Sequence, residues 1–128
     1  MPIDSRPVLG WMFGRGQNYS AQATGDRLGL NAKSQLIFSN GKETLTGKAN
    51  AERWKWHHAL LVRDKEKVQV YLDGKLEISG EANAVSSVET LFLGGRNNKE
   101  SSWEGRLDEA AIFNRALSAA EVKGLSTP

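Results

Sequence analysis

One stretch decides the fold class of this chain: Val68-Gln69-Val70-Tyr71-Leu72-Asp73-Gly74-Lys75-Leu76-Glu77-Ile78. Apolar and polar residues alternate on both sides of Asp73-Gly74, as in two strands that each turn one face to a core. An Asp-Gly pair readily adopts the two positive φ angles of a type I′ turn, so the stretch predicts a tight β-hairpin. Alternation then places Val68, Val70, Leu72, Leu76 and Ile78 on the buried face, and Gln69, Tyr71, Lys75 and Glu77 on the outer face.

The rest of the chain also favours strands. Residues 56–63 carry large apolar side chains on both parities, which predicts a central strand covered on both faces. Further strands are predicted between clusters of turn-forming residues, at 8–13, 27–30, 35–39, 43–45, 90–93 and 106–113. Many short strands with almost no helical periodicity predict an all-β fold, an antiparallel β-sandwich.

A single helix is expected, near the C-terminus. Ser118-Ala119-Ala120-Glu121 fits a capping box, in which the serine hydroxyl and the glutamate carboxylate bond each other's backbone amides. The apolar residues Val122 and Leu125 follow at helical spacing. We therefore predict a helix of about two turns that covers one edge of the sandwich.

Composition narrows the function classes. The chain has 128 residues, which is one domain by size. Its 17 Lys and Arg against 15 Asp and Glu give a net charge of +2 without long runs of one sign, and this argues against a nucleic-acid partner. The absence of cysteine excludes disulfides, thiolate zinc sites and a cysteine nucleophile. No apolar run is long enough for a membrane-spanning helix, and the first residues are unlike a signal peptide, so no membrane insertion is expected.

Three segments resemble the laminin-G-like, concanavalin A-like jelly-roll superfamily, in particular its pentraxin-related branch. They are the Trp-His-His segment at 56–64, the hairpin at 68–75, and 91–96 together with 105–118. The resemblance implies a jelly-roll sandwich over residues 8–128, with residues 1–7 as an N-terminal tail or the remnant of a preceding strand. It also implies an extracytoplasmic location, whether secreted, periplasmic or at the cell surface.

The same resemblance implies that one or two strands are lacking at the start. Members of this branch usually have further strands ahead of the segment that corresponds to residues 10–16, so a truncated domain, a piece of a longer protein and a variant with a shorter sheet are all open. An edge left unpaired in this way invites pairing with another copy or another segment.

Catalytic chemistry finds little support in the sequence. His57 and His58 are neighbours on a predicted strand, point to opposite faces and cannot share one metal ion. No Gly-x-Ser-x-Gly elbow is present, and no alternating carboxylates stand on one strand as in jelly-roll glycosidases. Asp108-Glu109 is an adjacent pair whose side chains diverge, and Asp108 is expected to point inward as a structural residue. We therefore predict no catalytic residues.

The sequence also contains side chains that are suited to contact a ligand. Trp11 and Trp56 lie within predicted strands and are expected in the core. Trp54 and Trp103 lie outside them, where both packing against the rim and an exposed face for stacking on a ligand are open. With Asn97 and Asn98 they form our predicted ligand-binding set. Asn97, Asn98 and Glu100 also offer oxygens to calcium, as in laminin-G and pentraxin relatives; the loop lacks the several carboxylates that calcium prefers, and calcium stays an open alternative.

These observations, with the resemblance, predict a non-catalytic module that recognises a carbohydrate or an extracellular protein through rim loops. One alternative is a structural or assembly module that packs on another domain of a larger secreted protein. A third reading is a degenerate glycoside hydrolase, which needs two carboxylates about 5–10 Å apart in a cleft.

Overall fold

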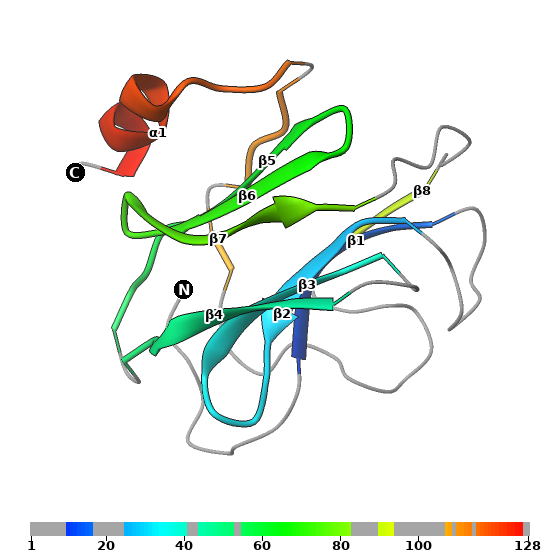
Figure 1. Cartoon of the computed structure of the whole chain (residues 1–128). Helices are drawn as coiled ribbons and strands as arrows, with labels where there is room; N and C mark the ends of the chain where they lie inside the picture. Colours follow the sequence, from blue (N-terminus) through cyan, green and yellow to red (C-terminus); the bar gives the residue numbers. More distant parts are fainter. Residues whose placement is uncertain are drawn as a thin grey trace.

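A computed structural model describes residues 10–16, 25–40, 44–52, 55–82, 90–93, 107–108, 110–113 and 115–126. Within these ranges lie β1 (Gly10–Gly16), β2 (Arg27–Leu30), β3 (Gln35–Ser39), β4 (Thr44–Asn50), β5 (Ala59–Asp64), β6 (Lys67–Leu72), β7 (Lys75–Glu81), β8 (Thr90–Leu93) and α1 (Ala119–Ser126). The strands form two sheets, one in the order β4-β3-β2-β1-β8 and the other in the order β5-β6-β7. All neighbours pair antiparallel, and the sheets lie face to face (Figure 1), which confirms the predicted sandwich with a C-terminal helix.

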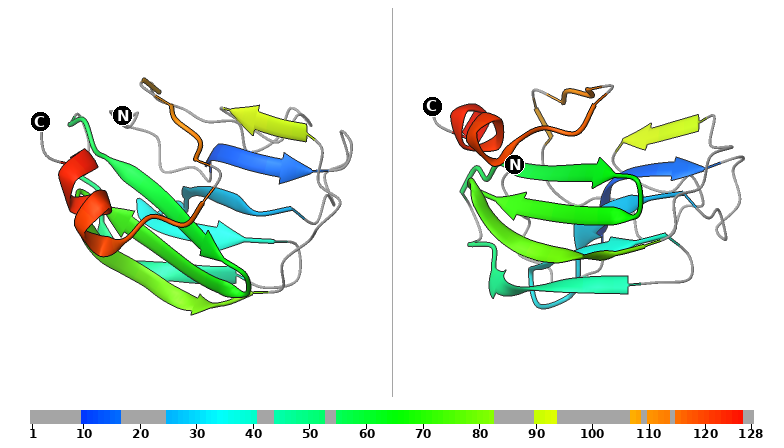
Figure 2. Two further views of the ribbon diagram at one scale, coloured as in Figure 1. Left: turned by 90° about the horizontal axis from the view of Figure 1, so that it is seen from above. Right: turned by 45° about the horizontal axis from the view of Figure 1, so that its top comes forward.

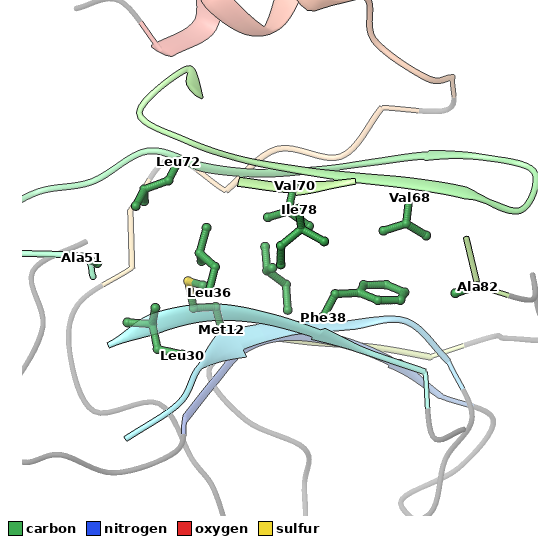
Figure 3. Close-up of a cluster of buried hydrophobic side chains, with 11 residues drawn as sticks. Met12, Leu30, Leu36, Phe38, Ala51, Val68, Val70, Leu72, Ile78 and Ala82 are labelled. Atoms are coloured by element: carbon green, nitrogen blue, oxygen red, sulfur yellow. The ribbon is translucent and has the colours of Figure 1, made fainter. Parts of the chain in front are cut away.

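The core fills the space between the two sheets. Figure 3 shows side chains from both sheets pointing toward one another, and the largest of them exclude solvent completely: Phe38, Leu36, Val68 and Val70. The predicted inward set Val68, Val70, Leu72 and Ile78 belongs to this cluster. Asp73 and Gly74 both have positive φ, at 51° and 83°, as the predicted type I′ turn requires.

Leu76 does not belong to the core, and the prediction that it does is wrong. Its side chain is 49% exposed. The reason is a register shift in the hairpin: Val70 pairs with Ile78, but Tyr71 pairs with Leu76, so Glu77 is an extra residue in β7. A bulge of this kind reverses the alternation on one side of it. Leu76 therefore shares the outer face with Tyr71.

Helix α1 adds a third layer rather than closing an edge. It lies on the face of the three-stranded sheet that points away from the other sheet (Figure 2). Val122 is fully buried there against Val62 and Tyr71, with Leu60 and Leu117 packed around them. The helix was expected to cover an edge of the sandwich, and that prediction is wrong because its single buried side chain packs onto a sheet face.

Strand β5 was predicted to be a central strand that is covered on both faces, and only the coverage is confirmed. Leu60 and Val62 face the helix layer, while Ala59 and Leu61 pack on the sandwich core, so both faces are covered as expected. In the described sheet, however, β5 is an edge strand rather than a central one.

The strand predicted at 106–113 is absent from the described part of that range. Residues 107–108 and 110–113 have no regular secondary structure, and Asp108, expected to point inward, is exposed. Ile112 and Phe113 are 71% and 49% exposed. Strand structure requires hydrogen bonds to a neighbouring strand. None of the strand pairs that the structure describes includes this segment, although its apolar residues favour strand formation.

Candidate functional site

The residues predicted for ligand and calcium binding, Trp54, Asn97, Asn98, Glu100 and Trp103, lie outside the residues that the structure describes. Their roles stay predictions. Trp56, two positions after Trp54, is a described residue whose side chain is suited to binding.

Trp56 was expected in the core, and the structure corrects this. The side chain is 57% exposed. The cause is the length of the partner strand: β6 ends at Leu72, which pairs with Ala59, and the chain then turns at Asp73. Strand β5 cannot extend ahead of Ala59 without a partner, so Trp56 lies beyond the end of the sheet.

The segment that carries Trp56 is held by His57. The His57 Nδ1 atom lies 2.7 Å from the Asp73 carboxylate, and its Nε2 atom lies 2.7 Å from the Glu52 carbonyl oxygen. The His57 side chain is only 9% exposed. The first bond connects His57 to the β6–β7 turn, and the second connects Glu52 to His57.

Asp73 is the centre of this arrangement. Its second carboxylate oxygen accepts a hydrogen bond of 2.8 Å from the His58 amide, and the Asp73 amide donates to the His58 carbonyl at 2.7 Å. Partial burial raises the pKa of the Asp73 carboxyl, but the His57 hydrogen bond, the His58 amide and the charges of both histidines together hold that pKa below its usual value. Asp73 thus stays a carboxylate in mild acid. The sequence predicted Asp73 as a turn residue because of its backbone angles, and its side chain also positions His57 and His58.

We call Glu52, Lys55, Trp56, His57 and Asp73 the Trp56 corner. Lys55 and Glu52 form an exposed ion pair with 2.8 Å between Nζ and the carboxylate. The corner therefore presents an indole flanked by charged groups, an arrangement suited to stacking on a sugar ring and hydrogen bonding its hydroxyls. Both carboxylates have partners, Asp73 with His57 and Glu52 with Lys55.

A second polar cluster lies at the other end of the three-stranded sheet. Arg63 donates from Nε and Nη2 to both carboxylate oxygens of Asp26, at 3.1 and 3.0 Å, and from Nη1 to the Ala82 and Glu66 carbonyls. Asp26 and Arg63 are 7% and 17% exposed, so this pair is a cross-link between the sheets. Arg63 ends the strand predicted at 56–63, and its parity with Ala59 and Leu61 was a signal that it faces inward.

Two further findings concern the described residues alone. No three of their His, Asp and Glu side chains gather closely enough to hold a metal ion. Nor does this part of the chain include a helix that is long and apolar enough to cross a membrane.

Comparison with known proteins supports the fold. A family model described as the concanavalin A-like lectin/glucanases superfamily matches residues 8–123. The structure is similar to the CBM40 of the Ruminococcus gnavus IT-sialidase bound to α2,3-sialyllactose, with TM-score 0.79 and 14% identity over 98% of this chain and 78% of that one. No curated protein sequence matches the chain.

Two other solved structures are also similar. The sialidase of Trypanosoma rangeli gives TM-score 0.76 at 18% identity over 98% of this chain and 21% of that one. The heptameric SAP-like pentraxin of Limulus polyphemus gives TM-score 0.73 at 16% identity over 98% of this chain and 66% of that one. At these identities the likeness concerns the fold.

Proposed function

Because the chain belongs to the concanavalin A-like lectin/glucanases superfamily, we propose that it is a non-catalytic carbohydrate-binding module that acts outside the cytoplasm. The family description covers both lectins and glucanases, so the choice between binding and hydrolysis rests on the site. The similarity to a module bound to α2,3-sialyllactose supports binding, and it makes that trisaccharide a suitable first probe.

The observation that carries the proposal is the exposed indole of Trp56. A tryptophan that is 57% exposed leaves a large apolar surface in water, and its face matches the apolar face of a sugar ring. His57 and Asp73 fix the backbone on one side of it. A binding group held in place before the ligand arrives loses less conformational entropy on binding.

The proposed surface also includes the residues predicted for binding from the sequence. Trp54 lies between Glu52 and Lys55, and we propose that it widens the aromatic surface of the Trp56 corner. Asn97, Asn98 and Trp103 are proposed as further contacts, with Asn97, Asn98 and Glu100 as ligands if calcium is required.

Calorimetric titration with α2,3-sialyllactose, lactose and a panel of soluble polysaccharides tests the proposal. For a sugar that binds, Trp56→Ala is expected to weaken affinity by about tenfold or more, because the stacking surface is lost. Phe113→Ala is the matched control, since Phe113 is also an exposed aromatic but belongs to a different segment. Equal affinity of the Trp56→Ala variant and the parent chain would rule out the Trp56 corner as the site.

A further inference from the structure

Both ring nitrogens of His57 face oxygen atoms that accept hydrogen bonds. Nδ1 lies 2.7 Å from the Asp73 carboxylate and Nε2 lies 2.7 Å from the Glu52 carbonyl. A carbonyl oxygen and an ionised carboxylate have no proton to give, so both protons in these bonds must come from the ring.

The neutral imidazole ring carries one proton only. In that form one nitrogen would direct its lone pair at an oxygen 2.7 Å away, which repels rather than binds. Only the imidazolium form donates from both nitrogens. The geometry therefore matches the doubly protonated ring.

We propose that His57 acts as a proton-dependent clamp, which as an imidazolium holds Glu52 and residues 55–57 to the β6–β7 turn and releases one of its two bonds when it becomes neutral. The clamp itself is independent of any ligand. Its consequence for recognition rests on the proposed function: Trp56 lies inside the clamped segment, so sugar binding is expected to be stronger in mild acid.

Several titratable or charged groups lie around the His57 ring. Asp73 faces it from the turn, and Glu52 with its partner Lys55 faces it from the same segment. His58 follows it and meets Asp73 through its amide. Lys75 follows the turn as the first residue of β7.

The elements packed on either side of the turn add neutral groups. From helix α1, Ser126 approaches Gly74, where a Cβ atom would lie 2.5 Å from the serine hydroxyl. Ala51 and Leu72 belong to the apolar core cluster.

The sign of the pH effect follows from these groups. The clamp needs the second N–H proton of the imidazolium, so it is expected to be closed in acid and to be released as the pH rises. The pKa of Asp73 lies below its usual value, so the carboxylate keeps its charge in mild acid and supports the clamp there.

Nuclear magnetic resonance of the complete chain, without ligand, tests the clamp. Nitrogen shifts of the His57 ring are expected to show both nitrogens protonated at about pH 5.5, and the amides of Glu52, Lys55 and Trp56 to shift in one step with the ring as the pH rises to about 7.5. His57→Gln is expected to remove that step, whereas His58→Gln, which changes the only other histidine, is expected to keep it. A His57 ring that is neutral at about pH 5.5, or segment amides that ignore its titration, would overturn the proposal. Asp73→Asn provides a second route to the same answer, since removal of the carboxylate charge is expected to move the step to lower pH.

Binding of α2,3-sialyllactose at the two pH values adds the functional arm. The parent chain is expected to bind about tenfold more weakly at about pH 7.5 than at about pH 5.5, which is the effect of one lost charge-assisted hydrogen bond, and the His57→Gln variant is expected to show no such ratio. A clear His57 step with binding that is equal at both pH values would contradict the coupling to recognition. A clear step with no binding of any sugar at either pH would sustain the clamp and overturn the proposed function instead.

Discussion

At the scale of single residues, two acidic side chains accept hydrogen bonds from backbone amides at positions where strand pairing ends or is irregular. Asp73 does so at the end of β5, where it accepts from the His58 amide. Glu77, the extra residue of the β7 bulge, does so across the sandwich: its carboxylate accepts from the Lys48 and Ala49 amides of β4 at 3.2 and 3.1 Å. Those amides lie where the β3–β4 register is itself irregular, so the carboxylate replaces bonds that the neighbouring strand does not make.

Removal of this carboxylate is therefore expected to destabilise the fold. Glu77→Ala should lower the free energy of unfolding by about 1–2 kcal/mol, because two amides lose a charged acceptor. Glu81→Ala, on the same strand and exposed, is the control and should change it by less than about 0.5 kcal/mol. Urea unfolding measures both, and equal losses in the two variants would refute this role of Glu77.

At the scale of elements, local sequence patterns predicted most accurately the features that depend on residues close together in the chain. The bounds of β2, β3 and β8 match the predicted ranges, and the capping box of α1 forms as expected, with the Ser118 hydroxyl accepting from the Glu121 amide and Glu121 accepting from the Ser118 amide. Three predictions were wrong because each depends on a partner strand. Leu76 is displaced by the bulge in β7, and Trp56 lies beyond the point where β6 ends. The described residues of the strand predicted at 106–113 are paired with no strand that the structure describes. Alternation within one segment carries no information about those features.

The capping box predicts how α1 responds to mutation. Ser118→Ala should destabilise the helix by about 1 kcal/mol, seen as faster hydrogen exchange at the Val122 and Lys123 amides, while Ser118→Thr should retain most of the protection. Unchanged exchange in Ser118→Ala would show that packing of Val122 alone holds the helix.

Acid should act on the same helix. Hydrogen bonds from Arg115 and Ser118 lower the pKa of Glu121 from 4.5 to about 2. The contribution of Glu121 is thus fully present above about pH 4.5 and is lost as the pH falls toward 2. In the Arg115→Ala variant, exchange of the helix amides should therefore rise at a higher pH than in the parent chain, and coincident profiles would contradict this.

At the scale of the whole molecule, the two sheets are joined by more than their apolar core. The β4 and β7 edges lie together on one side, where Glu77 bridges them, and the Arg63–Asp26 pair connects the sheets beneath the Phe38 ring, 5.9 Å from the Arg63 guanidinium. Alternation in the sequence predicted the apolar core. It could not predict these cross-links, because the two residues of each cross-link lie about 30 or more positions apart in the chain. Only the assembled sandwich brings them together.

The Arg63–Asp26 pair should therefore dominate the polar contribution to stability. Arg63→Met removes the guanidinium that binds both oxygens of a buried carboxylate and should cost about 3–5 kcal/mol, and Asp26→Leu added to it should restore a large part of the loss. Chemical denaturation measures both, and a double variant no more stable than Arg63→Met would show that the loss comes from packing rather than from the buried carboxylate.

The central claim is that sugars bind at the Trp56 corner, and the most direct measurement is a map of chemical-shift changes on titrating the isotope-labelled chain with a bound sugar. The indole signal of Trp56, assigned from the Trp56→Phe variant, and the amides of Lys55 and His58 are expected to shift together and to saturate at the same concentration. Saturable shifts confined to other residues, with the Trp56 indole unchanged, would contradict the account.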